Sequence, residues 1–158
     1  MTRRVQRRLF ERLRDARGAN LVEAAILTPL LLLLTLGIIE FAMLFYVYLA
    51  LENGASQASR YGVTGQVLQN QTREASVKSA MRRATPTLTL DDGAFSFSYM
   101  PLNGPPNWLN GIGGPNDISK VTINYTWTFI TPIIRPFFGP DGAIQLTVES
   151  AMKNESFQ

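Results

Sequence analysis

One apolar run constrains the chain more than any other feature of the sequence. It extends from Leu21 to Leu51, and its polar interruptions are Glu23, Thr28, Thr35 and Glu40. A helix crosses the apolar core of a bilayer with about 20 residues, so this run is long enough to span a membrane and to continue beyond it. A secretory signal peptide would have a shorter apolar region with a small-residue cleavage site soon after it. We therefore predict a transmembrane helix over residues 19–51.

Positive charge is concentrated before this run. The first 18 residues contain seven arginines, which are Arg3, Arg4, Arg7, Arg8, Arg12, Arg14 and Arg17. With Glu11 and Asp15 the segment has a net charge of +5, whereas residues 19–158 have a net charge of −2. Basic residues flank membrane helices on the cytoplasmic side, which predicts a cytoplasmic leader over residues 1–18 and an extracytoplasmic domain over residues 52–158. Nucleic-acid binding is disfavoured, because it needs basic charge on the folded surface.

The sequence contains no cysteine and no histidine. Most zinc, copper and haem sites need thiolate or imidazole ligands, and cysteine- or histidine-based catalysis is excluded for the same reason. The three lysines, Lys78, Lys120 and Lys153, are not accompanied by a recognisable nucleophile motif. We therefore predict no enzymatic activity, no catalytic residue, no cofactor and no metal site.

Three residues within the apolar run are candidates for contacts between helices. Glu40 and Pro29 each have two interpretations, and Gly37 has a predicted packing role. Glu40 lies about 25 Å from Glu23 along a helix that rises ~1.5 Å per residue, so the two carboxyl groups fall near opposite edges of the bilayer core. Glu40 is then either an interfacial or protonated side chain, or a contact with a neighbouring subunit. Pro29 is either a tolerated membrane proline or a hinge. Small residues such as Gly37 allow neighbouring helices to pack closely.

The junction between leader and apolar run reads Arg17-Gly18-Ala19-Asn20-Leu21-Val22-Glu23. It resembles the processing site of type IV prepilins and pseudopilins, in which a membrane prepilin peptidase cuts after the glycine that ends a basic leader. The resemblance implies cleavage between Gly18 and Ala19. It also implies that Glu23, as the fifth mature residue, meets the new amino terminus of an adjacent subunit and sets the axial register. An opposite charge best stabilises a charge in apolar surroundings.

A longer stretch extends this similarity. The residues that carry it are Arg17–Ala25, the leucine run that follows, Gly37–Phe41, Leu44–Tyr46, Ala55, Ala58 and Ser59–Gly62. They resemble the TadE-like family, the small pilin-like proteins of tight-adherence (Flp-type) pilus systems, and residues 146–155 are similar more weakly. The resemblance implies a minor pilin or pseudopilin in the bacterial inner membrane. Its implied partners are the peptidase, a sister minor pilin, the major pilin, the inner-membrane assembly platform and membrane lipid.

Helical patterns continue after the apolar run. Good helix formers extend from Ala50 to about Tyr61, and Gly62 and Gly65 predict a break. A second helix is predicted over Thr72–Ala84. Its apolar stripe is formed by Val77, Ala80, Met81 and Ala84, at the spacing of one helix face.

Later segments alternate with a period of two. Thr87–Leu90 and Phe95–Tyr99 flank the turn signal Asp91-Asp92-Gly93 and predict a hairpin. Val121–Phe129 alternates apolar and polar side chains, and so do residues 144–149. One buried and one wet face is typical of an antiparallel sheet, and the helical segment 50–84 is the available cover. We predict an α+β, pilin-like domain with a helix packed on an antiparallel sheet.

Two proline-rich segments read as loops. Residues 101–117 are expected to form a surface loop around Trp108. Residues 131–142 contain Ile133, Ile134, Phe137 and Phe138. These side chains either pack back on the sheet or form an exposed apolar patch for a partner or the membrane surface.

The leading interpretation is a structural assembly protein, which either enters the pilus fibre or stays at its base. The alternative is an uncleaved single-span membrane protein whose outer domain binds a ligand or a cell-wall component. A mature chain that begins at Met1 would favour this alternative.

Overall fold

The computed structural model describes residues 3–157, and for residues 3–17 it describes the backbone only. The arginine side chains of the predicted leader, and residues 1–2, therefore lie outside the described part. The chain divides into two compact units, the first ending at Phe41 and the second beginning at Ala42. Helix α1 (Arg3–Val63) contributes to both units, which are described separately below.

Within the first unit, α1 is exposed on all sides from residue 18 to residue 35. Every residue from 18 to 35 is exposed, including the leucines of the apolar run, and the helix continues through Pro29. A helix that is apolar all round is stable only where a membrane or other helices cover it. The segment Gly18–Val63 is a candidate membrane span by length and composition.

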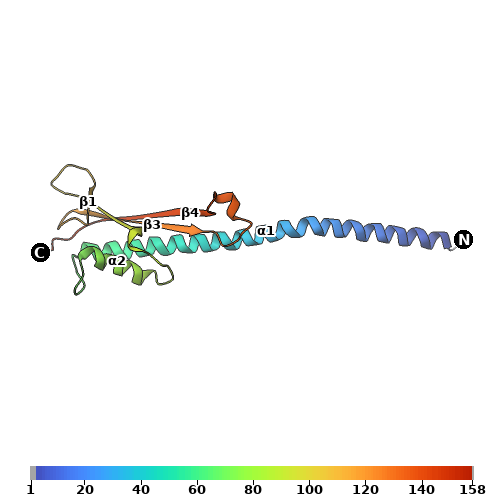
Figure 1. Ribbon diagram of the computed structural model, residues 1–158, viewed down its shortest axis with the longest axis horizontal. Helices are drawn as coiled ribbons and strands as arrows, with labels where there is room; N and C mark the ends of the chain where they lie inside the picture. Colours follow the sequence, from blue (N-terminus) through green and yellow to red (C-terminus); the bar gives the residue numbers. More distant parts are fainter. Residues whose placement is uncertain (1–2, 158) are drawn as a thin grey trace. The chain divides into compact units, whose positions relative to one another are not determined.

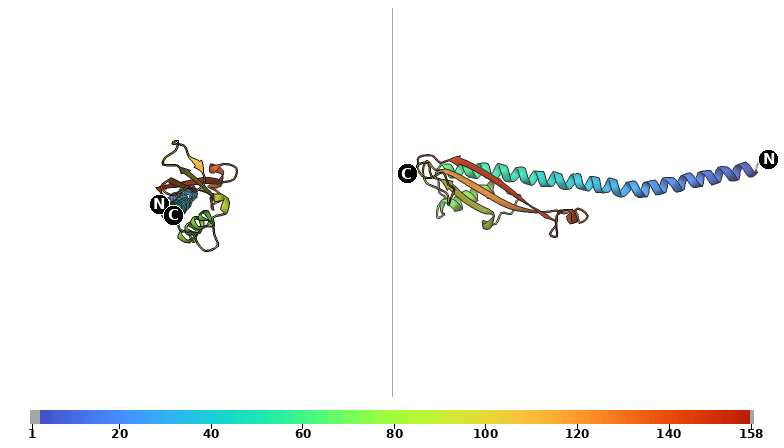
Figure 2. Two further views of the ribbon diagram at one scale, coloured as in Figure 1. Left: turned by 90° about the vertical axis from the view of Figure 1, so that its left-hand side faces the viewer. Right: turned by 90° about the horizontal axis from the view of Figure 1, so that it is seen from above.

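The second unit combines helices with a four-stranded antiparallel sheet (Figures 1 and 2). Its elements after α1 are α2 (Arg73–Ala84), the short 3-10 helix η1 (Asp92–Ala94), β1 (Phe95–Met100), β2 (Leu109–Asn110), β3 (Ile118–Thr128), the 3-10 helix η2 (Arg135–Phe138) and β4 (Ala143–Lys153). The strand order is β2-β1-β3-β4, which leaves β4 at one edge. The α+β architecture predicted from the sequence is confirmed.

A single core cluster joins both helices to the sheet. From α1 it takes Leu51, Ala55 and Ala58, which recur on one helix face and are fully buried. From α2 it takes Val77 and Met81. The sheet contributes Phe95, Val121, Ile123 and Val148. The predicted covering of the sheet by segment 50–84 is therefore confirmed, and burial of each large side chain stabilises the domain by about 1.5–3 kcal/mol.

Helix α2 begins and ends as its sequence predicts. The hydroxyl of Thr72 caps the helix by accepting a hydrogen bond from the Ala75 amide, at 3.2 Å. Glu74 lies in the first turn, and Arg82 and Arg83 lie in the last. This distribution of charge is the one that the helix dipole favours.

The two long strands also follow the predicted alternation. β3 and β4 pair in register from Ile118 opposite Lys153 to Thr128 opposite Ala143. Their core-facing side chains include Val121, Ile123 and Val148, whereas the alternate residues of β4 from 145 to 153 are exposed. The sheet therefore has one buried and one wet face.

The predicted hairpin over 87–99 is wrong in its first strand. Thr87–Leu90 forms no strand, and β1 pairs instead with β2 and β3. The reason is a contact with α2: Leu90 is buried, and its carbonyl accepts a hydrogen bond from Arg82 Nε at 3.0 Å. Asp92 pairs with the same guanidinium at 2.6 Å. The turn residues consequently form η1 and return the chain to the sheet.

Strand β2 lies inside the segment that the sequence predicted to be a loop. Its two residues pair with Ser98 and Tyr99 of β1. The rest of the loop is held by Asp117, whose carboxylate accepts a hydrogen bond from the Gly114 amide at 2.7 Å. A strand of two exposed residues shows no alternation of apolar and polar side chains, so the sequence pattern did not predict it.

Candidate processing and assembly site

Gly18 and Ala19, the residues of the predicted cleavage site, lie on the exposed surface of α1. A methyl group built at Gly18 would meet no atom within 4 Å, so a side chain would fit there. Glycine in a helix interior is less stable than alanine by about 1 kcal/mol. The fold of the described residues therefore gives no reason for glycine at this position.

Glu23 is exposed one helical turn after Ala19. Residues at this spacing lie on the same face of a helix. If the bond before Ala19 were cut, the new ammonium group and the first turn of the shortened helix would both attract the Glu23 carboxylate. The arrangement can therefore supply one positive and one negative group at the end of an apolar helix, either to each other or to a neighbouring chain.

Pro29 and Gly37 are the two predicted packing positions of the same helix. Pro29 is exposed, and α1 continues past it. A side chain at Gly37 would also meet no atom within 4 Å. Neither residue type is therefore required by packing among the described residues, and their predicted role in contacts between helices stays a prediction.

Glu40 differs from the other predicted site residues because its side chain is only 1% exposed. It is among the largest fully buried side chains of the described residues. A buried carboxyl group is stable only with hydrogen-bond or charge partners. Both interpretations of Glu40, as an interfacial group and as a subunit contact, stay predictions.

Sequence reasoning missed a polar cluster at the far end of the second unit, built around Arg73. Its guanidinium donates hydrogen bonds to the carbonyl of Gly113 at 2.6 Å and to that of Gly62 at 2.8 Å. It also lies 4.5 Å from the ring centre of Phe157. Burial lowers the pKa of Arg73 and outweighs the opposing effect of Asp117. The partners of Arg73 are mainly backbone carbonyls, which no side-chain motif reveals.

The apolar side chains of segment 131–142 were expected either to pack back on the sheet or to form an exposed patch, and the structure shows both. Ile134 is buried, and the Phe138 ring stacks on Phe129 with 3.9 Å between ring centres. In contrast, Ile133 is 58% and Phe137 is 76% exposed. The loop therefore packs back on the sheet with one set of side chains and exposes another.

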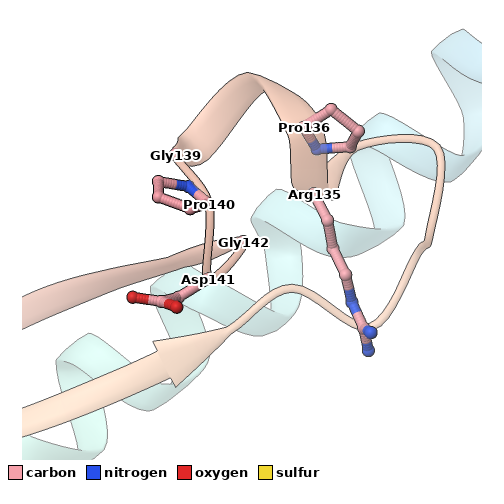
Figure 3. A pocket seen from close by; sticks show the side chains of 6 residues that line it. All are labelled: Arg135, Pro136, Gly139, Pro140, Asp141 and Gly142. Atoms are coloured by element: carbon pink, nitrogen blue, oxygen red, sulfur yellow. The ribbon is translucent and has the colours of Figure 1, made fainter.

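A hollow beside η2 does not have the form of a chemical site. It is lined by Arg135, Pro136, Gly139, Pro140, Asp141 and Gly142. Figure 3 shows that the Arg135 and Asp141 side chains point apart instead of converging on the hollow. Ligand sites place a few polar groups so that they converge, and this hollow does not.

Residues 18–60 match the family model of TadE-like proteins. The match confirms the resemblance seen in the sequence, and it begins at Gly18. TadE-like proteins are a structural and assembly family of tight-adherence (Tad) pilus systems, so the match links the chain to these systems. The match does not include residues 146–155. No curated protein and no solved structure matches the chain.

Proposed function

We propose that this chain is a minor pilin or pseudopilin that takes part in the assembly of a tight-adherence, Flp-type pilus in the bacterial inner membrane. The observation that carries the proposal is a coincidence at Gly18. The TadE-like match begins there, the apolar run of α1 begins three residues later at Leu21, and packing among the described residues gives no reason for glycine at that position. A prepilin peptidase that cuts after Gly18 supplies the missing reason.

The proposal places the amino terminus in the cytoplasm and the second unit in the periplasm. The seven arginines of residues 1–18 support this orientation, because basic residues are retained on the cytoplasmic side. Residues 1–18 are then a leader that is removed, and residues 19–51 are the membrane helix, whose last part from Ala42 onward leaves the bilayer core and belongs to the second unit. Residues 52–158 form the rest of the periplasmic domain. The amino-terminal helix of the mature chain begins at Ala19.

Assembly would depend on the exposed apolar surface of α1. In a bilayer such helices associate through close packing and through polar groups that find partners. The Ala19 ammonium of one subunit and the Glu23 carboxylate of the next would form such a pair and fix their axial register. The partners are the sister minor pilin, the major pilin and the inner-membrane assembly platform, and the work is lateral packing without bond chemistry.

The decisive measurement is the mass of the amino-terminal peptide of the membrane-bound protein, with and without a prepilin peptidase. We expect a chain that begins at Ala19 when the peptidase is active. Gly18→Leu should block the cut because its side chain obstructs the peptidase. Gly37→Leu, which changes an equally open glycine of the same helix, should leave the cut intact. An uncut chain beside an active peptidase would refute processing and favour the uncleaved single-span alternative.

A second measurement separates processing from assembly. In Glu23→Gln we expect cleavage to persist while pilus assembly fails, because the ammonium group of the neighbour loses its charged partner. Glu52→Gln is the matched control, since Glu52 is also an exposed glutamate of α1. Normal piliation in Glu23→Gln, scored by electron microscopy of the cells, would refute the register role.

A further inference from the structure

The loop between β3 and β4 presents an apolar tip, here called the η2 tip and defined as residues 132–137. Ile133 and Phe137 are both more than half exposed. Pro132 and Pro136 are exposed beside them. Two large apolar side chains on one short tip need a partner or a special environment more than single exposed residues do.

The hydrogen bonds of the second unit fix the place of this tip along α1. Ser59 Oγ donates to the Ser150 carbonyl at 3.2 Å, and the Glu155 amide donates to the Val63 carbonyl at 2.9 Å. The end of α1 therefore lies beside the end of β4. β4 has 11 residues, and at ~3.3 Å per residue its start lies about 36 Å away.

The same distance corresponds to roughly 24 residues of helix at ~1.5 Å each. Counted back from Val63, this leads to the beginning of the second unit, close to Ala42. Figures 1 and 2 show η2 at the end of the long strands opposite the carboxyl terminus. The η2 tip thus lies at the end of the domain through which the chain enters from the apolar part of α1.

The predicted membrane span ends close to the residue at which the chain enters the second unit. A span that begins near Leu21 and needs about 20 residues ends near Glu40. Apolar side chains such as phenylalanine and leucine enter the boundary between headgroups and acyl chains in segments that lie on a membrane surface. Arg135 supplies a cation on the same tip, and its Nε is anchored on the Phe129 carbonyl at 2.6 Å. Arginine at this level attracts lipid phosphate groups.

We propose that the η2 tip is a second membrane contact of this protein, in which Ile133 and Phe137 enter the boundary between headgroups and acyl chains. Arg135 lies at the phosphate groups. The contact would hold the domain on the bilayer surface in addition to α1. This inference rests on the proposed function, because it requires α1 to span the membrane.

Exposure alone does not identify the partner, because the other end of the domain is also apolar. Leu102 is 52% exposed. Its loop follows β1, whose last residue, Met100, lies opposite Ile118 at the start of β3. Leu102 is nearly as exposed as Ile133 but lies at the far end of the strands, which makes it a control for position.

The test uses the full-length chain in vesicles of phosphatidylethanolamine and phosphatidylglycerol, with and without bromine atoms on the acyl chains. The chain contains no cysteine, so Phe137→Cys, Leu102→Cys and Leu31→Cys each carry one environment-sensitive fluorophore. Bromine quenches only fluorophores that touch lipid. We expect on the order of twofold quenching or more at positions 31 and 137, as for buried groups of interfacial segments, and none at position 102.

The three positions separate the two claims. Quenching at 31 without quenching at 137 would overturn the membrane contact of the tip and leave the proposed span intact. An unquenched fluorophore at 31 would overturn the span and with it the proposed function. If a second copy of the chain covered the tip, position 137 would be shielded from lipid, and the lack of quenching would again overturn the inference. Phe137 is largely exposed, so its replacement leaves the core of the domain intact.

Discussion

The two parts of α1 have the same secondary structure and opposite surroundings. Residues 18–35 are exposed on every side, although most are apolar. Within the second unit, a stripe that includes Leu51, Ala55 and Ala58 is fully buried, while residues such as Glu52 and Gln57 face solvent. Helical structure alone therefore does not determine what covers a helix. The distribution of apolar residues around the axis does.

The glycines of the two parts also differ in their surroundings. At Gly54 a methyl group would lie 2.6 Å from both Met81 Sδ and Thr85 Cγ2, so the domain needs a residue without a side chain. At Gly18 and Gly37 nothing lies within 4 Å. Gly54 of the domain part is a packing residue, whereas packing among the described residues does not explain the glycines of the apolar part.

Matched leucine substitutions should show the largest difference between the two parts. Leu51→Ala removes a fully buried side chain and should lower the free energy of unfolding by about 2–5 kcal/mol, because it leaves a cavity. Leu31→Ala, at a position that is 60% exposed, should leave it unchanged. The measurement is urea unfolding of the full chain in detergent, followed by near-ultraviolet circular dichroism. Equal losses in the two variants would break the comparison.

Substitution of Arg73, which binds the carbonyl of Gly62 near the end of α1, should give the next largest loss of stability. In Arg73→Lys the planar fork that reaches both Gly62 and Gly113 is lost, and we expect a loss of about 2 kcal/mol in the free energy of unfolding. Arg83→Lys changes an exposed arginine of the same helix and is the control. If both variants unfold at the same urea concentration as the parent, the Arg73 cluster does not stabilise the domain.

Alanine substitutions at Gly54 and Gly37 should change the melting temperature of the domain differently. Gly54→Ala gains about 1 kcal/mol of helix propensity but crowds Met81 and Thr85, which costs about 1–3 kcal/mol, so the melting temperature should fall. Gly37→Ala has no such contact and should leave the melting temperature of the domain the same or slightly higher. A rise in Gly54→Ala would show that Met81 moves aside without cost.

Lowering the pH should produce the smallest loss of stability, and this loss should be confined to the second unit. A hydrogen bond from Arg82, helped by the charge of Lys78, lowers the pKa of Asp92. Hydrogen bonds from Thr122 and Lys120 lower the pKa of Glu149. Below the ordinary carboxyl pKa values of 3.8 and 4.5 the unfolded chain therefore binds more protons than the folded chain, so stability is lost as pH falls. Both pairs are exposed, and the loss should be small.

The measurement for this last effect is the melting temperature between pH 6 and 3, at low and high salt. Asp92→Asn combined with Glu149→Gln should flatten the profile, and salt should weaken the dependence because exposed charges are screened. Far-ultraviolet circular dichroism should show that the helix content of α1 persists through the acid range. A pH dependence that survives the double substitution would assign it to other groups.

Local patterns could be predicted from the sequence, and long-range contacts could not. The bounds of α2 and the alternation of β3 depend on neighbouring residues and were predicted. The false strand at Thr87–Leu90 followed from a genuine turn signal, and its failure depends on Arg82, which the sequence does not place beside Leu90. The junction of Gly18 and Glu23 could be singled out from the sequence because the hypothesis rests on spacing, and its role stays a prediction. The burial of Glu40 depends on the fold and was not predicted.

The long separation of partners in the domain has a consequence for the order of events during synthesis. Ser59 and Ser150, which are bonded in the folded domain, are 91 residues apart in the chain. The face of α1 that carries Leu51 is therefore made well before the strands that cover it, Val148 included. Contacts between distant residues form slowly. During that interval the nascent helix exposes an apolar face that can aggregate, so the factors that receive the growing chain have to cover it.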